Sequence, residues 1–388
     1  MAWVIFWCSA GIAFHFLIGY PLLLRFLPFR PRPVAKDLAF RPPVTILMAV
    51  HNGADFIIPK LESLLGLEYP RDGFEIVILD DQSSDATVEL AASFAASHNQ
   101  VPIEIIRLKK GGKAAALNAG LARQNREILF FTDVRQPLHP AALQHLASNF
   151  ADPSVGAVTG ELRFLSSGHT TDEQATMDLY WRYELWVREQ HSLRDSLFNT
   201  TGCIYAMRRQ WAHPIPDDSL TDDALLPLGA YFAGKRIVFE AQALAYDYPH
   251  REGGEWGRRM RTLAGMWQTY ARHPRLLLDP RRMWFHFLSH KLGRVLLPWT
   301  LLINIGATFA LPPSVFRSSL IAGNLLLATL ALGSRWSKPT SLLHKIGSRA
   351  HTFLSMNLAA LASTQVFFRD PRKLWQPSKV LPISRLSS

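Results

Sequence analysis

Five aspartates stand next to short apolar segments, where their carboxylates could do chemistry. They are Asp80, Asp81, Asp133, Asp222 and Asp223. Carboxylate oxygens hold divalent metal ions, and such an ion can carry a diphosphate. A further carboxylate can accept the proton of an attacking hydroxyl group. The pattern predicts a site for a diphosphate-containing substrate, although aspartates also favour helix caps and turns.

The elements that must position these side chains are strands that alternate with helices. Four β-rich apolar segments are predicted as strands, at residues 44–50, 74–79, 103–108 and 127–132. Helical patterns occupy residues 57–67, 86–96 and 113–122. Such alternation predicts an α/β fold with a mostly parallel sheet and helices on both faces. Ligands bind beyond the carboxyl ends of strands in these sheets, where Asp80, Asp81 and Asp133 are expected.

Six short motifs follow one another between residues 44 and 271. They are Val50-His-Asn52, Asp80-Asp-Gln-Ser-Ser-Asp85, Gly111-Gly-Lys-Ala-Ala-Ala-Leu-Asn118, Asn199-Thr-Thr-Gly202, Thr221-Asp-Asp223 and Arg258-Arg-Met-Arg-Thr262. In residue type and order they resemble the motifs of the family 2 glycosyltransferases. That family contains the cellulose, chitin, hyaluronan and poly-N-acetylglucosamine synthases, and the resemblance extends to the flanking membrane segments.

The resemblance implies a GT-A fold and a nucleotide-sugar donor, with uridine as the expected nucleoside. The residues that it assigns to donor binding are His51, Asn52, Asp80, Asp81, Lys113, Asp133, Arg135, Asn199, Gly202 and Asp222. It places a divalent cation, Mg²⁺ or Mn²⁺, on Asp133 and makes Asp223 the catalytic base. Arg258 and Arg261 would stabilise the departing diphosphate, because they share one helix face. A basic face against lipid headgroups is the alternative for these two arginines.

Two positions depart from the family pattern. The Asp-x-Asp motif is Asp133-Val-Arg135, so a cation replaces the second acid. Arg135 is expected either to contact phosphate directly or to be a surface cation. Thr262 stands where the family has the Trp of Gln-x-x-Arg-Trp, which supports the acceptor sugar in processive members. Synthesis of long chains is therefore not expected from the motif alone.

The charge distribution argues against a nucleic-acid-binding domain. The formal net charge of the 388 residues is +11, and residues 285–388 contain 12 Lys and Arg but one acid, Asp370. The rest of the chain is balanced, and basic residues between apolar stretches fit loops beside anionic lipid. Gly111-Gly-Lys113 lacks the first glycine and the Ser or Thr of a phosphate-binding P-loop. We therefore expect membrane lipid as a partner and no nucleic acid.

Apolar segments at both ends predict a membrane protein. Residues 3–24 carry no charge and are long enough to span a bilayer. Residues 292–311 and 320–332 are also apolar. Residues 350–368 contain more polar side chains and are expected to lie in the membrane interface or to re-enter the membrane. Basic residues after the first segment predict a cytoplasmic catalytic domain and a cytoplasmic Ser388. The expected location is the bacterial inner membrane.

These features divide the chain into six predicted segments. They are an N-terminal transmembrane anchor (1–27), a proline-rich linker (28–43), a GT-A catalytic domain (44–250), interfacial helices with the arginine motif (251–290), a C-terminal membrane region (291–370) and a tail (371–388). The sequence predicts an inverting glycosyltransferase that transfers a sugar to a saccharide or lipid-linked acceptor. The alternatives are a polyprenyl-phosphate sugar transferase and a catalytically inactive nucleotide-sugar-binding membrane protein.

Overall fold

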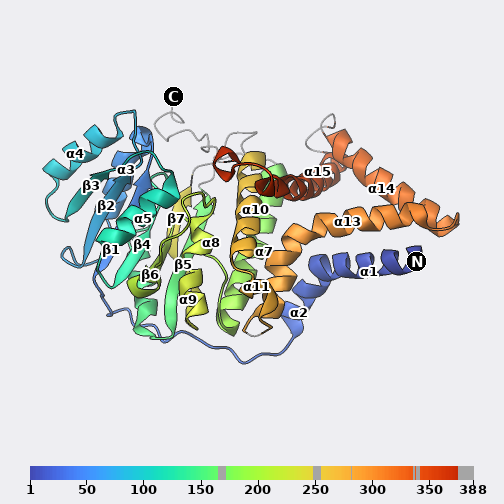
Figure 1. Ribbon diagram of the computed structural model, residues 1–388, viewed down its shortest axis with the longest axis horizontal. Helices are drawn as coiled ribbons and strands as arrows, with labels where there is room; N and C mark the ends of the chain where they lie inside the picture. Colours follow the sequence, from blue (N-terminus) through green and yellow to red (C-terminus); the bar gives the residue numbers. More distant parts are fainter. Residues whose placement is uncertain (165–171, 248–254, 281, 335–336, 338–340, 375–388) are drawn as a thin grey trace. The chain divides into compact units, whose positions relative to one another are not determined.

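Figure 1 shows the computed structural model of the chain, which describes residues 1–164, 172–247, 255–280, 282–334, 337 and 341–374. The chain divides into two compact units. The helical unit consists of Met1–Phe29, Gly168–Val187 and Gly253–Gln376, and the sheet unit consists of Arg30–Ser167, Arg188–Glu252 and Pro377–Ser388. The predicted domain bounds stay a prediction: the sheet unit begins at Arg30 and not at residue 44, and residues 168–187 belong to the helical unit.

The sheet unit is built on seven strands in the order β3-β2-β1-β4-β6-β5-β7. The strands are β1 Val44–Val50, β2 Phe74–Asp80, β3 Ile103–Arg107, β4 Ile128–Phe131, β5 Val155–Phe164, β6 Tyr205–Arg208 and β7 Arg236–Asp247. Only β6 runs against its neighbours, which confirms the predicted mostly parallel sheet. The four predicted strands are found within a residue of their expected bounds.

Helices cover this sheet and follow the strands in sequence (Figure 1). They are α3 Ala54–Leu65, α4 Thr87–Ser97, α5 Lys113–Arg123, α6 Ala142–Ser148, α8 Asp222–Leu225, α9 Leu228–Phe232 and the carboxyl-terminal part of α7 Asp172–Arg194. Short 3-10 turns lie at Asn149–Ala151 and Arg209–Trp211. The first predicted helix begins three residues earlier than expected, because Gly53 ends the preceding turn.

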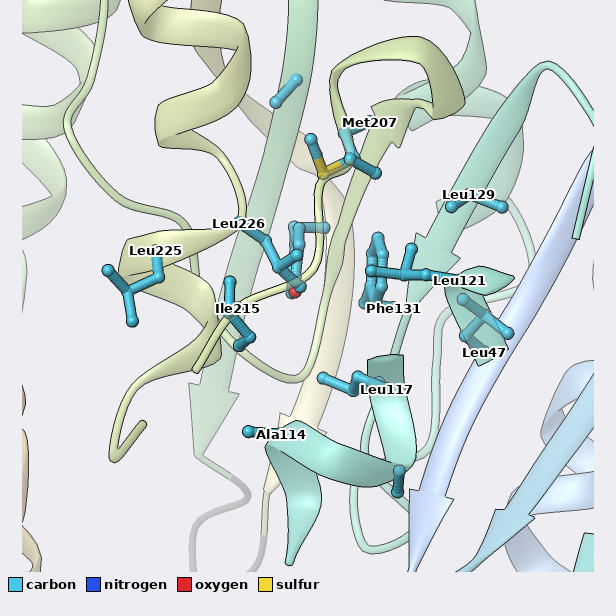
Figure 2. Close-up of a cluster of buried hydrophobic side chains, with 14 of the residues drawn as sticks. Leu47, Ala114, Leu117, Leu121, Leu129, Phe131, Met207, Ile215, Leu225 and Leu226 are labelled. Carbon is cyan, nitrogen blue, oxygen red and sulfur yellow. The ribbon is translucent and has the colours of Figure 1, made fainter. Parts of the chain in front are cut away.

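The core lies where α5 packs on one face of the sheet (Figure 2). Alternate residues of a strand point to the same face, so Leu47 of β1 and Phe131 of β4 meet there. Leu117 and Leu121 of α5 are one helical turn apart and cover them. Gly120 lies on the same face, where an added Cβ would come within 2.8 Å of the Leu79 side chain. The small residue therefore lets α5 approach the strands, which places the start of the helix at the sheet edge.

The helical unit contains the apolar ends of the chain. Its elements are α1 Ala2–Phe14, α2 Tyr20–Phe26, the amino-terminal part of α7, α10 Glu255–Arg272, α11 Arg275–Leu278, α12 Trp284–His286, α13 Gly293–Ala310, α14 Val315–Gly333 and α15 Leu342–Ala362. Two π-helical segments lie at His15–Gly19 and Phe287–Leu292, and 3-10 turns at Ser363–Phe367 and Pro371–Leu374. α1 packs along α13, where Asn304 Nδ2 donates to Phe6 O at 3.1 Å and to Ser9 Oγ at 3.0 Å.

Among the residues that the structure describes, three helices are long and apolar enough to cross a membrane. They are Ala2–Phe26, Trp284–Ala310 and Val315–Gly333. By these helices the chain is a membrane protein, and the predicted segments 292–311 and 320–332 overlap the second and third of them. α15, which covers much of the softer segment 350–368, is not one of the three. Ser388 and most of the predicted tail 371–388 lie outside the described residues.

Candidate active site

The carboxyl ends of the parallel strands bring the first predicted residues together. β1 and β2 pair in parallel up to Asp80, so His51 and Asn52 follow β1 beside Asp80 and Asp81. His51 Nδ1 lies 2.9 Å from the main-chain O of Asp81. Asn52 Oδ1 accepts a hydrogen bond from Ser84 N at 2.8 Å. The first and second motifs therefore form one pair of interlocked turns.

This edge of the sheet concentrates unusual backbone conformations. Five described residues have a positive φ, and three of them are Asn52 (52°), Gln82 (57°) and Gly112 (86°) in the turns after β1, β2 and β3. Non-glycine residues there cost roughly 1–3 kcal/mol each and persist only where neighbours hold them. The Gln82 side chain is held by the main-chain N–H of Lys110, which donates to Oε1 at 3.2 Å. Such clusters are typical of ligand-binding edges.

Asp81 connects the acidic turn to the start of α5. Its carboxylate accepts hydrogen bonds from Gly111 N at 2.7 Å and from Gly112 N at 3.0 Å. Asp80 is also buried, and its Oδ1 accepts from Ser83 N at 3.1 Å. Glycine is suited to position 112 because its φ of 86° is strained for other residues. The two aspartates of the second motif thus order the turns around the nucleotide-binding position that the sequence predicts.

Lys113, the first residue of α5, bridges the two later acidic motifs. Its Nζ donates to Asp133 Oδ1 at 2.8 Å and lies 3.1 Å from Asp222 Oδ1. Burial alone would lower the pKa of Lys113, but the two carboxylates raise it. The side chain therefore carries a positive charge. Tyr205 OH donates to Asp222 Oδ2 at 3.3 Å. Residues 113, 133 and 222, far apart in sequence, therefore share one charged centre.

Asp223 lies beside this centre. Burial and the neighbouring Asp222 carboxylate raise its pKa to about 6, while Lys113 and Arg188 oppose the rise. Gly202 faces this side chain, since a Cβ added there would lie 3.5 Å from Asp223 Oδ2. A carboxylate with a pKa close to neutrality is suited to accept a proton. The geometry therefore separates Asp222, a counter-ion of Lys113, from Asp223, whose pKa is raised.

The loop of the fourth motif is tied to the main chain of Asp223. Thr200 N and Thr200 Oγ1 donate to Asp223 O at 2.9 Å and 3.0 Å. Arg188 of α7 is buried, and its Nη1 donates to Thr201 Oγ1 at 2.7 Å. Asn199 Nδ2 donates to Thr200 O at 3.3 Å. Asn199 and Gly202 are thus brought to the same site as Asp223, as the order of the motifs suggests.

Arg135 has a partner that the sequence did not reveal. Its Nε and Nη2 donate to Oδ1 and Oδ2 of Asp247 at 2.9 Å and 2.8 Å, and Asp247 ends β7. The arginine side chain is 20% exposed, so it is not a free surface cation. Its guanidinium is engaged in a bidentate ion pair, which is a third possibility beside the two expected from sequence.

Sequence reasoning missed three buried charged residues around the site: Lys60, Arg188 and Asp247. Burial lowers the pKa of Lys60 to about 7, and its Nζ donates to Thr132 Oγ1 at 2.7 Å. A signal was present, because Lys60 lies on the apolar face of α3 with Ile57 and Leu61, where a charge needs a partner. Asp247 follows a β-rich segment, as Asp80 does, and could have been found in the same way.

Arg258, Arg261 and Thr262 lie on α10, in the helical unit. Both arginines are partly buried, and Thr262 is exposed, with its Oγ1 donating to Arg258 O at 3.0 Å. The other predicted site residues all belong to the sheet unit. The role of the two arginines at the diphosphate remains a prediction.

The donor set fits a hard divalent cation that is bound largely by its substrate. Two carboxylate oxygens, from Asp133 and Asp222, converge on one positive charge, the Lys113 ammonium. Within the described ranges no three His, Cys, Asp or Glu side chains form a metal-binding group. Mg²⁺ and related ions commonly use one or two carboxylates and complete their shell with substrate phosphates and water. Asp133, the more exposed of the two carboxylates, is the residue that fits this role.

Comparisons with known proteins agree with this fold. Residues 45–215 match the model of glycosyl transferase family 2. The poly-beta-1,6-N-acetyl-D-glucosamine synthase of Staphylococcus epidermidis is 25% identical over 274 residues, which cover 65% of this chain and 65% of that protein. The probable glycosyltransferase YdaM of Bacillus subtilis is 24% identical over 232 residues, 56% of this chain and 53% of that one. The match thus spans between about half and two thirds of these relatives.

A solved structure extends the likeness beyond the sheet. The mannosyltransferase PcManGT from Pyrobaculum calidifontis, in complex with GDP-Man and Mn²⁺, aligns with a TM-score of 0.76 and 22% identity. The alignment covers 95% of this chain and 99% of that one. The fold is therefore of the GT-A type, flanked by membrane helices. Residues 45–215 are therefore similar to glycosyl transferase family 2, and the likeness to the solved structure shows the fold.

Proposed function

We propose that this protein is a membrane-bound glycosyltransferase. It moves a sugar from a nucleotide-sugar donor to a saccharide or lipid-linked acceptor. The observation that carries the proposal is the pair of neighbouring acids, Asp222 and Asp223. One is a counter-ion of Lys113, and the other has a pKa of about 6 beside the loop of Gly202. The Asp133 and Asp222 carboxylates outnumber the Lys113 ammonium, so this centre would take a divalent cation together with a diphosphate, while Asp223 supplies a base for a hydroxyl.

The reaction is a single inverting displacement. Asp223 accepts the proton of the acceptor hydroxyl, whose oxygen forms the new bond to the anomeric carbon. The bond from that carbon to the diphosphate oxygen breaks, and its electron pair leaves with the nucleoside diphosphate. Lys113 lies where positive charge can meet the diphosphate, because it already holds Asp133 and Asp222. General-base catalysis contributes about 10²–10⁴-fold, and stabilisation of the leaving group often contributes more.

A divalent cation held by Asp133 would supply further positive charge to the departing diphosphate. Mn²⁺ is present in the related mannosyltransferase structure, which makes Mn²⁺ and Mg²⁺ the ions to test. Arg258 and Arg261 are proposed to add to this charge from α10. The remaining donor contacts are assigned to the interlocked turns of His51, Asn52 and Asp81.

The acceptor and the cellular location follow from the membrane segments. Three candidate spans support a membrane location, and with the positive-inside rule we propose a cytoplasmic sheet unit at the inner membrane of a bacterium. Donor and acceptor would meet at the membrane surface. The relatives bear the names of a poly-N-acetylglucosamine synthase and a mannosyltransferase. UDP-N-acetylglucosamine and GDP-mannose are therefore the first donors to examine, and the family resemblance favours the uridine nucleotide.

The decisive experiment is a panel of nucleotide sugars with purified protein in detergent and Mg²⁺ or Mn²⁺, scored for release of nucleoside diphosphate. Release from one donor, dependent on the added cation, is the expected result. No release from any donor, with or without acceptor lipids, would contradict the proposal. It would favour the alternative of a catalytically inactive nucleotide-sugar-binding protein, which Arg135 and Thr262 motivate.

The second candidate function is a polyprenyl-phosphate sugar transferase. Its acceptor is a phosphate, which is already ionised and needs little help from a base. An Asp223→Asn variant distinguishes the two functions, because transfer to a hydroxyl should need the carboxylate. The raised pKa of Asp223 favours the hydroxyl acceptor.

A further inference from the structure

The turn that carries Asp133 is held at both ends by one buried ammonium group. Lys60 of α3 is 1% exposed, and its Nζ donates to Thr132 Oγ1 at 2.7 Å and to Gln136 O at 2.5 Å. Thr132 Oγ1 in turn donates to Cys203 O at 2.8 Å. Asp133 lies between these two anchor points. One lysine therefore spans the turn from its first to its last residue.

A buried carboxylate holds the middle of the same turn. Asp247 is 1% exposed and accepts two hydrogen bonds from Arg135, at 2.9 Å and 2.8 Å. Gln136 Nε2 donates to Asp247 Oδ2 at 2.9 Å. The main chain adds to this contact, because Tyr246 N donates to Pro137 O at 2.9 Å. The end of β7 is thus hydrogen-bonded to the segment that follows the turn.

Stability alone does not account for these charges. Taking charged groups out of water is costly, and apolar residues of similar volume are often as stabilising as a buried ion pair. A bidentate guanidinium and an ammonium with several acceptors do fix orientation, which apolar packing does less well. The group whose orientation they fix is Asp133, whose side chain is 36% exposed and binds Lys113.

We propose that Arg135, Asp247 and Lys60 are positioning residues that set the Asp133 carboxylate for the donor diphosphate and its divalent cation. The inference rests on the proposed function, which assigns that role to Asp133. Arg135 stands where the family has a second acid. It acts through Asp247 and contributes rigidity to the turn, while the cation is left to Asp133 and the substrate.

The test compares two matched carboxylates of β7. Glu240 is also buried, binds Lys36 Nζ at 2.6 Å and accepts from Asn149 Nδ2 at 2.9 Å, as Asp247 binds Arg135 and Gln136. Asp247→Asn and Glu240→Gln each remove one charge from such a pair. The measurements are the melting temperature and the affinity for uridine and guanosine diphosphate across a Mn²⁺ titration. Loss of a residue that orients a metal ligand typically weakens metal affinity about 10–100-fold.

We expect both variants to melt at lower temperature, but only Asp247→Asn to raise the half-saturating Mn²⁺ concentration for nucleotide binding, by about 10-fold or more. The donor KM should rise in parallel while kcat changes less, because Asp223 is untouched. Arg135→Lys should behave as Asp247→Asn does. The double variant of Arg135→Lys and Asp247→Asn should weaken Mn²⁺-dependent nucleotide binding little more than either single variant, because both changes break the same contact. Lys60→Met should weaken Mn²⁺-dependent binding through its own contacts.

Equal nucleotide affinity in wild type and Asp247→Asn at every Mn²⁺ concentration would overturn the inference and leave the proposed function intact. The inference would also be overturned, with the proposed function intact, if Glu240→Gln weakened Mn²⁺-dependent nucleotide binding as much as Asp247→Asn. The effect would then be one of general stability. A wild-type protein that binds neither nucleotide with Mn²⁺ would remove the proposed function and the inference together.

Discussion

Asp222 and Asp223 are adjacent in sequence but differ in their surroundings. Asp222 Oδ1 lies 3.1 Å from the Lys113 ammonium and Asp222 Oδ2 accepts from Tyr205, so its charge is compensated. Burial and the charge of Asp222 raise the pKa of Asp223. Two carboxylates with different environments can take different roles at one pH. The first turn of α8 thus presents a counter-ion and a base side by side.

The first prediction concerns this base. Asp223→Asn keeps the shape of the side chain but cannot accept a proton, so sugar transfer to a hydroxyl should fall about 100-fold or more. Binding of nucleoside diphosphate should persist, because Lys113 and Asp133 are unchanged. Single-turnover transfer and nucleotide titration are the measurements. A variant that keeps more than about a tenth of the wild-type rate would show that Asp223 is not the base.

The second prediction is the pH dependence of the reaction. The base must be ionised, and a raised pKa means that ionisation is lost as pH falls through about 6. kcat/KM should therefore be level above that pH and fall about tenfold per pH unit below it. Asp222→Asn removes the neighbouring negative charge and should move the acidic limb to lower pH. The measurement is kcat/KM between pH 4.5 and 8 for wild type and Asp222→Asn. An acidic limb at the same pH in both proteins would contradict this account.

The third prediction concerns the cation. Asp133→Ala should abolish the dependence of donor binding on Mn²⁺, since it removes the carboxylate best placed to hold the ion. Asp152→Ala is the control, because Asp152 precedes β5 at the amino ends of the strands and accepts from Ser154 N at 2.8 Å. Calorimetric titration with and without Mn²⁺ measures both variants. Unchanged Mn²⁺-dependent affinity in Asp133→Ala would exclude Asp133 as the ligand.

At the scale of elements, the start of α5 joins the two halves of the site. Gly111 and Gly112 donate their main-chain N–H groups to Asp81, and the next residue is Lys113. The helix then packs on the sheet through Leu117 and Leu121 (Figure 2). The packing of α5 therefore determines where the Lys113 ammonium lies relative to the ends of β2 and β4.

The fourth prediction tests this coupling with two glycines that both have a positive φ. Gly112 and Gly234 have φ values of 86° and 77°, and neither has a neighbour within 4 Å of an added Cβ. Alanine at either position should lower the free energy of unfolding by about 1–2 kcal/mol through backbone strain. Only Gly112→Ala should also weaken nucleotide binding, because it disturbs the contacts of Asp81 and Lys113. Equal nucleotide affinity in the two variants would show that the start of α5 is not part of the site.

At the scale of the whole molecule, the chain combines a GT-A sheet with membrane helices from both of its ends. The three candidate spans are Ala2–Phe26, Trp284–Ala310 and Val315–Gly333. α15 begins with Ser341 as its cap, whose side chain accepts from His344 N, and is preceded and followed by basic residues. If these three helices all span, the chain ends would lie on opposite sides of the membrane, and the tail is expected on the side of the sheet unit.

The fifth prediction is this topology. In a chain whose Cys8 and Cys203 are replaced, a single cysteine at Ser388 should not react with an impermeant reagent in intact cells, because the tail is expected to be cytoplasmic. A cysteine at Ser314, between α13 and α14, should react and serves as the positive control. Efficient labelling at Ser388 would show that the segment containing α15 crosses the membrane.

Local sequence patterns are enough to predict the first strands and helices of the sheet and most of the motif residues. Period, composition and short-range turn chemistry act within about ten residues, so β1 to β4, the first three helices of the sheet and the candidate spans could be predicted. The acidic motifs were found because each follows a strand or turn with a distinctive residue type. The family resemblance then gave each motif an expected role.

The pairing of these residues depends on the folded arrangement of distant segments. Lys113, Asp133 and Asp222 become one charged centre through the parallel pairing of strands and the packing of α5. Lys113 is 20 residues from Asp133 and 109 residues from Asp222 in the sequence. The same holds for Arg135 and Asp247, 112 residues apart, and for Lys60 under the Asp133 turn. Burial, which raises the pKa of Asp223, is likewise a property of the assembled fold. Local sequence patterns carry the identity of a charged residue, but its partner and its exposure to water depend on which distant segments the sheet brings beside it.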